Sequence, residues 1–315
     1  MYSNQKILIE LIQKLWTVLR FVLIIGMAFV LMYPILYMIS IAFRDPVDML
    51  DPSIIWLSKN LTLSNFTEAA QALKFTSSLI NSLLIGGASS LLQVISCTLV
   101  AYGFARYRFK LRKVLFACVM LTIIVPPQVT ILPLFLLFKD FSSPIIGPLL
   151  KSLAGVNLSV NLLDKPLVFY LQAVFGLGLR SGLCIFLLRQ FFKGLPAELE
   201  EAAEIDGCGP YQTFGRIMLP NAVPMLLTVF LFSFIWYWND YYTTNIFISD
   251  NMTLAIALSQ LRISLATQTE NVTNMYESIT QMQAGCLMFV APLLLLYVFT
   301  QRYFVESIDR SGLVG

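Results

Sequence analysis

The 315-residue chain contains no histidine. This absence excludes histidine-ligated metal sites, histidine general bases and Ser-His triads, which serve most familiar hydrolytic mechanisms. The chain also lacks the Gly-Lys-Ser/Thr sequence of a phosphate-binding loop. An ATP-driven process would therefore need a second polypeptide to hydrolyse the nucleotide, and we expect no cofactor or metal in this chain.

Charge is scarce as well. Charged residues make up 12% of the chain, against about 25% in soluble domains. Hydrophobic residues make up 57%, and the mean hydropathy is +0.76. This is more apolar surface than a water-soluble core could absorb. The composition predicts an integral membrane protein.

Long uncharged runs define the expected spans. A helix needs roughly 20 residues to cross a hydrocarbon core of about 30 Å. Five runs qualify outright, and a sixth is interrupted only by Arg180. The first run is too long for a cleaved signal peptide and should remain as an anchor. We predict an all-α membrane protein with a domain over residues 21–305 and six transmembrane helices, at about 21–43, 77–105, 114–138, 167–188, 220–247 and 280–304.

The distribution of lysine and arginine sets the orientation. A dense basic cluster over residues 106–113 separates the second and third spans. Because short cytoplasmic loops carry the excess of positive charge, this loop is placed inside. The N-terminal segment 1–20 and the C-terminal tail 306–315 are then both cytoplasmic.

A cytoplasmic segment over residues 190–220 follows the fourth span. Pro196 can open a short helix, Gly207 can end it in a left-handed conformation, and Pro210 can open a second one. Five acidic groups lie between Glu198 and Asp206. An amphipathic helix on the membrane surface is one reading, but helices adapted to an anionic leaflet are normally basic. The chemistry favours docking into a groove of another protein.

The same segment resembles the EAA loop of type I ABC-importer permeases. The resemblance rests on Glu201-Ala202-Ala203, three residues, Gly207, nine residues, and then Ile217, Leu219 and Pro220. Residues 81–85, 101–109, 124–128, 186–192 and 238–239 are similar to the smaller permease of maltose-type, carbohydrate-uptake-1 importers. The resemblance covers about residues 20–315 and implies the type I importer permease fold.

That resemblance implies a set of partners and contacts. It implies a second, homologous permease, two copies of an ABC ATPase that bind ATP and magnesium, and an extracytoplasmic solute-binding protein, in the cytoplasmic membrane of a bacterium or archaeon. The ATPase contact would comprise Glu201, Ala202, Ala203, Asp206, Gly207, Ile217, Leu219 and Pro220. The tail 306–315 would lie between the ATPases, although it lacks the lysine usual in the family. Residues 249–277 would reach toward the binding protein or serve as a connector.

Several residues are candidates for the solute path. Trp236, Trp238, Asn239 and Asp240 cluster near the end of the fifth span. Their aromatic rings could form an interfacial belt or stack on sugar faces along the path. Arg180 could extend to the membrane surface or face a cavity. The pair Pro126-Pro127 predicts a break in the third span, either a hinge or a fixed bend.

The predicted function is translocation of a carbohydrate, an oligosaccharide, by alternating access driven by a partner's ATP hydrolysis. A permease for a non-sugar solute is the alternative within the same class. A secondary transporter would place carboxylates in the spans, where this chain has almost none. A polytopic membrane enzyme is disfavoured by the lack of histidine and of clustered catalytic carboxylates.

Overall fold

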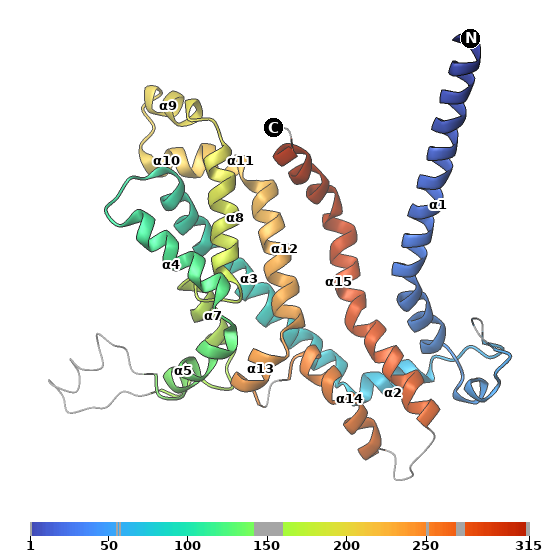
Figure 1. The fold of residues 1–315 in the computed structure, drawn as a ribbon. Helices are drawn as coiled ribbons and strands as arrows, with labels where there is room; N and C mark the ends of the chain where they lie inside the picture. Colours follow the sequence, from blue (N-terminus) through green and yellow to red (C-terminus); the bar gives the residue numbers. More distant parts are fainter. Residues whose placement is uncertain are drawn as a thin grey trace. The chain divides into compact units, whose positions relative to one another are not determined.

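The computed structural model describes residues 2–54, 56, 58–141, 160–249, 252–268 and 275–312. Within these ranges the chain is helical and contains no β-strand (Figure 1). Two isolated β-bridges, Arg44 with Leu61 and Phe141 with Val160, close loops. The predicted all-α class is confirmed. The chain divides into two compact units, residues 1–72 with 261–290, and residues 73–260 with 291–315.

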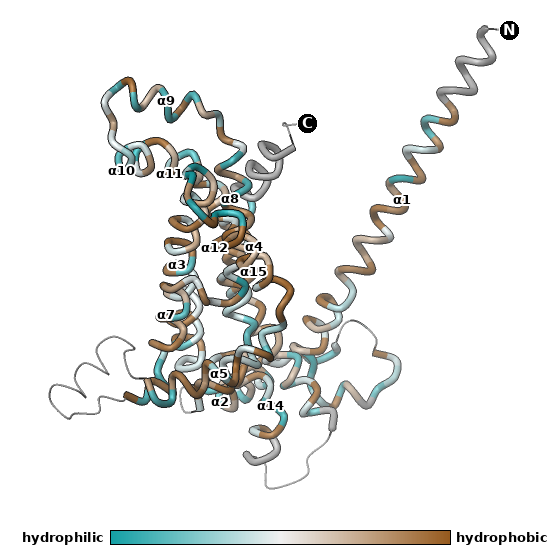
Figure 2. Tube along the Cα trace, turned by 60° about the vertical axis from the view of Figure 1, so that its left-hand side comes forward, coloured by the Kyte–Doolittle hydropathy of each residue, from teal (hydrophilic) through white to brown (hydrophobic). Residues whose placement is uncertain are grey.

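The first unit begins with one long helix, α1 (Tyr2–Ala42). Its 41 residues correspond to about 60 Å, twice the thickness of a hydrocarbon core. The expected span at 21–43 lies in this helix except for its last residue, Phe43, and the segment before the span continues the same helix. Every side chain from residue 11 to residue 34 is exposed, and Figure 2 shows apolar residues along its middle. This surface is suited to lipid or to another membrane helix.

A hydrogen-bonded loop follows α1 and contains the 3-10 helix η1 (Pro46–Leu50). The Asp48 carboxylate accepts bonds from the Ser58 hydroxyl at 2.5 Å and from the backbone N–H groups of Lys59 and Asn60 at 2.9 and 3.0 Å. These bonds favour the charged form and hold the pKa of Asp48 below its usual value. The loop is therefore fixed by its own polar groups.

Helix α2 (Ser64–Ala72) closes the first unit against the start of α15 (Met275–Gly312). Ala42, Ala69 and Ala284 form the centre of a small apolar cluster. Asn65 donates to the carbonyl of Ala42 at 3.0 Å and accepts from the Thr280 hydroxyl at 3.0 Å. One buried amide thus joins three segments that are far apart in sequence.

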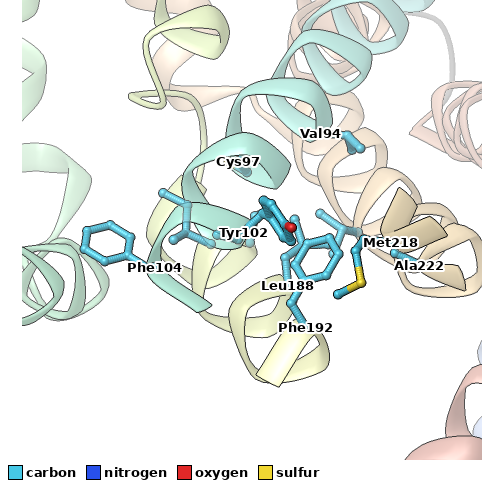
Figure 3. Close-up of a cluster of buried hydrophobic side chains, with 12 residues drawn as sticks. Val94, Cys97, Tyr102, Phe104, Leu188, Phe192, Met218 and Ala222 are labelled. Atoms are coloured by element: carbon cyan, nitrogen blue, oxygen red, sulfur yellow. The ribbon is translucent and has the colours of Figure 1, made fainter. Parts of the chain in front are cut away.

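The second unit is built around α3 (Phe75–Arg106). It packs against α7 (Leu167–Val174), α8 (Ser181–Gly194) and α12 (Val223–Asn239). Figure 3 shows Tyr102 of α3 among side chains of α8 and the segment before α12. The expected second span, 77–105, lies within α3, which extends two residues before it and one residue after it.

The third expected span is bent. Helix α4 (Arg112–Ile124) and α5 (Pro127–Lys139) meet at 101°. Val125 and Pro126 have extended backbones, because a residue before proline avoids the helical region and proline cannot bond back into the helix. The break predicted at Pro126-Pro127 is therefore present.

The fourth expected span, 167–188, is not a single helix. It divides into α7 and α8, and Gly176 and Arg180 between them have positive φ angles of 70° and 55°. Two glycines, Gly176 and Gly178, weaken helix formation there. Arg180 therefore lies at the N-terminal boundary of α8 rather than within a continuous helix.

The fifth expected span begins three residues later than proposed. Helix α11 (Leu219–Asn221) contains Pro220, and α12 starts at Val223 after a bend of 73°. Helix α13 (Tyr242–Phe247) follows α12. By length and composition, the described residues supply three spanning helices, or up to five if each bent pair counts as one. The six-span count stays a prediction.

Residues 249–277 were expected to form a polar loop or connector. The structure instead contains a helix there, α14 (Leu254–Gln268). Its start is fixed to α3, because the backbone N–H of Leu254 donates to the Ser82 hydroxyl at 2.7 Å and the Asn81 amide donates to the carbonyl of Met252 at 3.3 Å. Residues 250, 251 and 269–274 lie outside the described residues. Helix α15 covers the sixth expected span and continues into the predicted tail to Gly312.

Candidate functional site

The segment between α8 and α12, residues 195–222, is called the coupling segment below. It contains α9 (Glu198–Ile205), α10 (Pro210–Thr213), the π-helical turn η2 (Phe214–Met218) and α11. In Figure 1 α9 and α10 lie beyond the end of α8. Helix α10 starts at Pro210 as predicted, whereas α9 starts at Glu198, two residues after Pro196.

Helix α9 ends in a complete glycine cap. Gly207 has a φ of 79°, as expected for the left-handed residue. Its N–H donates to the carbonyl of Glu204 at 3.0 Å, and the N–H of Cys208 donates to the carbonyl of Ala203 at 2.9 Å. These two bonds form the Schellman motif, which satisfies the last carbonyls of a helix. The turn between α9 and α10 therefore depends on one glycine, Gly207.

The coupling segment presents an exposed surface of mixed character. Glu201, Ala202 and Asp206 are exposed, and so are two large apolar side chains, Ile205 at 86% and Tyr211 at 92%. Large apolar side chains exposed together with acidic ones are typical of a surface that binds another protein. We call these five residues the docking surface.

The other predicted contact residues lie differently. Ala203 is 1% exposed, so it supports packing within the segment instead of forming part of the docking surface. Ile217 and Leu219 are half-buried, and Pro220 is exposed. The sequence did not indicate Tyr211 as a surface residue, although an aromatic side chain directly after a helix-opening proline was a usable signal.

One acidic side chain of α9 faces inward. The Tyr102 hydroxyl donates to Glu200 at 2.8 Å, and Arg106 lies 3.4 Å from the same carboxylate. Arg106 also donates to the carbonyl of Leu195 at 2.7 Å. The Phe214 ring lies 4.6 Å from the Tyr102 ring, measured between centroids. The C-terminal end of α3 is therefore bound to the coupling segment at three points.

Two cations cover the end of α3 itself. Arg112 donates to the carbonyl of Phe104 at 2.6 Å, and Arg189 donates to the same carbonyl at 3.4 Å. The Arg189 guanidinium also lies 3.8 Å from the centroid of the Phe116 ring. Positive groups at a helix C-terminus stabilise its unpaired carbonyls. Arg106 and Arg112 of the basic cluster at 106–113 thus stabilise the C-terminal end of α3 and its contact with the coupling segment.

A cavity of about 530 Å³ lies where the third and fourth expected spans break. Its walls come from the α4–α5 bend, from residues 172–182 and from Thr243. Arg180 lines it, and the Arg180 guanidinium lies 5.1 Å from the centroid of the Trp236 ring. The structure thus brings together two of the predicted path residues.

Of the remaining path candidates, Trp238 and Asp240 make structural contacts, and their part in the path stays a prediction. Trp238 is 1% exposed, and its ring lies 5.6 Å from that of Phe234. Asp240 accepts bonds from the backbone N–H of Thr243 at 3.2 Å and of Thr244 at 2.9 Å. Asp240 therefore caps the start of α13, and Trp238 belongs to the core. Asn239 is exposed, and its amide donates to the carbonyl of Ile235 at 2.8 Å.

Sequence reasoning missed a buried polar network beside the cavity. The Tyr237 hydroxyl donates to the Gln93 side-chain oxygen at 2.9 Å, and the Gln93 amide donates to the carbonyl of Leu179 at 2.8 Å. The N–H of Leu179 donates to the Tyr237 hydroxyl at 3.3 Å. A glutamine in the middle of an apolar span was the available signal, because such a side chain needs partners.

Comparison with known proteins places the chain among membrane components of importers. A family model described as "binding-protein-dependent transport system inner membrane component" matches residues 95–310. The chain is 28% identical over 312 residues to the arabinooligosaccharides transport system permease protein AraQ of Halalkalibacterium halodurans, covering 96% of this chain and 99% of that protein. It is 29% identical over 269 residues to the melibiose/raffinose/stachyose import permease protein MelC of Bacillus subtilis, covering 84% and 86%.

A solved structure shares the fold. It is a bacterial ABC transporter involved in the import of the acidic polysaccharide alginate, with a TM-score of 0.69 and 21% sequence identity over 92% of this chain and 97% of that chain. The helical architecture described above is therefore that of an ABC importer permease.

Proposed function

Because the chain belongs to the family of binding-protein-dependent transport system inner membrane components, we propose that it carries an oligosaccharide into the cytoplasm as one permease subunit of an ATP-driven importer. Relatives that match over most of the chain are named for arabinooligosaccharides and for melibiose, raffinose and stachyose. These names support a carbohydrate substrate over a non-sugar solute.

The docking surface is the observation that carries this proposal. It combines acidic groups with the exposed apolar side chains of Ile205 and Tyr211. Such a surface suits a protein groove that is basic at its rim and apolar at its base. The partner in this proposal is an ABC ATPase, present in two copies, which binds ATP and magnesium.

The attachment of the coupling segment to α3 supplies a route for the ATPase's movement. A displacement of α9 acts on α3 through Glu200, because that carboxylate contacts both Tyr102 and Arg106. The same helix holds Gln93, whose amide binds the backbone of Leu179 beside the cavity. Helix α3 therefore connects the docking surface with the cavity by direct contacts.

The other partners follow from the importer class. A second, homologous permease completes the path across the cytoplasmic membrane, and the exposed apolar side chains of α1 provide membrane-embedded surface for lipid or for that subunit. A solute-binding protein outside the membrane delivers the oligosaccharide. The host is a bacterium or archaeon.

Purification in mild detergent tests the assembly. The chain should bring down an ATPase and a second permease, in a proportion of two ATPase copies to one copy of this chain and one copy of the second permease. The reconstituted complex should accumulate a labelled oligosaccharide in vesicles only with ATP and the binding protein present. Isolation of the chain as an active lone monomer, or uptake driven by an ion gradient without ATP, would contradict the proposal.

Two variants, each with one introduced cysteine, give a sharper test of the docking surface. In a chain whose accessible Cys118 and Cys208 are replaced by serine, Tyr211→Cys should form a cross-link to the ATPase with a short reagent that joins a thiol to a lysine amine, because this side chain is almost fully exposed. Val47→Cys is the matched control, since Val47 is 71% exposed but lies in the loop after α1. Equal cross-linking of both variants to the ATPase would contradict the assigned surface.

A further inference from the structure

The cavity beside Arg180 exists because two helices are interrupted at the same place. The α4–α5 bend and the α7–α8 break both contribute to its walls. Interrupted backbone at membrane depth is tolerated where it lines a cavity or is buried in protein. A volume of about 530 Å³ lies within the usual range for small-molecule sites, about 300–1,000 Å³.

The cavity offers hydrogen-bond donors and positive charge. No aspartate or glutamate is among its lining residues. Within the described part of the chain, the Arg180 guanidinium makes no hydrogen bond or ion pair, and its contact is the face of Trp236. It stands at the first turn of α8, where the helix dipole is also positive.

A second side chain points to the same ligand chemistry. Gln172 lines the cavity and is 7% exposed, and its side-chain NH₂ group has no hydrogen-bond partner. A buried donor without a partner costs about 1–3 kcal/mol, so it is expected to meet an acceptor in the working state. The hydroxyls nearby are already committed, since Thr122 donates to Val119 and Ser181 donates to Gly178.

We infer that this cavity binds the transported oligosaccharide through a carboxylate, so that the substrate class is an acidic, uronate-containing sugar. The carboxylate accepts bonds from Arg180 and Gln172 and neutralises the one guanidinium in the cavity. A neutral sugar would offer no counter-ion to the Arg180 guanidinium, which is exposed toward the open cavity. The Trp236 ring keeps the guanidinium oriented while the site is empty.

This inference rests on the proposed transport function, but it can fail separately. The test is a binding titration with the purified transporter complex of this chain, the second permease and the ATPase. The complex is held in nanodiscs of phosphatidylcholine, without binding protein and without ATP. The probe is trigalacturonate, and its fully methyl-esterified form is the neutral counterpart with the same ring hydroxyls. The readout is tryptophan emission, with Trp236→Phe defining the contribution of Trp236.

The acid should change Trp236 emission saturably and bind about tenfold tighter than the ester, because hydrogen bonds to charged groups exceed neutral ones by that order. Arg180→Gln should remove the preference for the acid, and Gln172→Glu should reverse it by placing a like charge against the carboxylate. Lys165→Gln is the matched control, since it removes an exposed cation outside the cavity and should leave the preference unchanged.

Three results would overturn the inference. Equal binding of acid and ester shows that the cavity does not select charge. Absence of a saturable change with either sugar shows that the cavity is not a sugar site. An identical change on adding phosphatidylglycerol to the nanodiscs, with loss of sugar binding, assigns the cavity to an anionic lipid headgroup. Failure of the transport proposal would instead appear as no ATPase in the purified complex.

Discussion

The two ends of α8 make an instructive comparison. At its N-terminal end, Gln93 and Tyr237 bind the backbone of Leu179, while the Phe175, Leu177 and Arg180 side chains are exposed. At its C-terminal end, the coupling segment is bound to Arg106 of α3 through Glu200 and Leu195. Each region contains a left-handed residue, Arg180 in the first and Gly207 in the second.

The two ends of α8 differ in which groups remain without a partner in the described part of this chain. The N-terminal break is held by neutral, buried hydrogen bonds, and its unused donors face the cavity. The C-terminal break is held by a half-buried carboxylate, and its unused surface faces away from the protein. The first arrangement fixes a side chain in position, whereas the second presents a surface to a partner.

The largest expected effect is steric and occurs at the N-terminal break. A Cβ atom at Gly178 would lie 2.3 Å from the Gln93 side-chain oxygen and 2.4 Å from the Tyr237 hydroxyl. Gly178→Ala should therefore destabilise the protein by about 2 kcal/mol or more. The thermal midpoint of the detergent-solubilised protein measures this. Gly209→Ala is the control, because nothing lies within 4 Å of its Cβ position. An equal fall of the thermal midpoint in both variants would show that the close packing at Gly178 is not the cause.

The next effect is on coupling, at Gly207. Its Cβ position is open, but its φ of 79° strains a side chain that is branched at Cβ. Gly207→Val should cost about 1–2 kcal/mol at the turn and reduce ATP-driven uptake by about tenfold, with the protein still in the membrane. Gly207→Asn, which tolerates the left-handed region, should retain most of the uptake. Similar uptake by both variants would show that the turn is not needed.

A smaller effect is expected at Glu200. Glu200→Gln keeps an acceptor for Tyr102 but loses the charge that pairs with Arg106. We expect a loss of about 0.5–1.5 kcal/mol and faster hydrogen exchange of the α9 amides. Glu204→Gln is the control, because Glu204 is exposed on the same helix. Unchanged exchange in Glu200→Gln would mean that the carboxylate does not hold α9 against α3.

The smallest effect on stability should come from the docking surface. Ile205→Ser changes a side chain that is 86% exposed, so stability should remain within about 0.5 kcal/mol. The yield of copurified ATPase should nevertheless fall. Leu63→Ser, at 66% exposure in the first unit, should leave that yield unchanged. An unchanged yield of ATPase with Ile205→Ser would show that Ile205 is not part of the ATPase contact.

Local signals in the sequence predicted much of the fold. Uncharged length identified α3 to within two residues at each end, the Pro126-Pro127 pair marked the bend between α4 and α5, and Gly207 was identified as the left-handed end of α9. Each of these depends on the residue itself and its immediate neighbours. Such features can be read without knowing what packs against them.

The missed features depend on contacts between distant segments. Gln93 and Tyr237 are 144 residues apart, and the break at Arg180 is held by both. Glu200 looked like its exposed acidic neighbours until Tyr102, 98 residues earlier, was found beside it. Trp238 is buried while Trp236 meets Arg180, although both lie on α12. A pattern along one helix does not show which face another segment will cover.

The buried polar side chains of α3 have a consequence for biosynthesis. Ser89, Ser90 and Gln93 are fully buried in the folded second unit, yet the partners of Gln93 at Leu179 and Tyr237 are synthesised 86 and 144 residues later. An amide in hydrocarbon without partners is costly. During translation, exposure of this face of α3 to lipid therefore carries a cost until the residues around Leu179 and Tyr237 have been made. We therefore expect α3 to be released from this cost only when α12 packs against it.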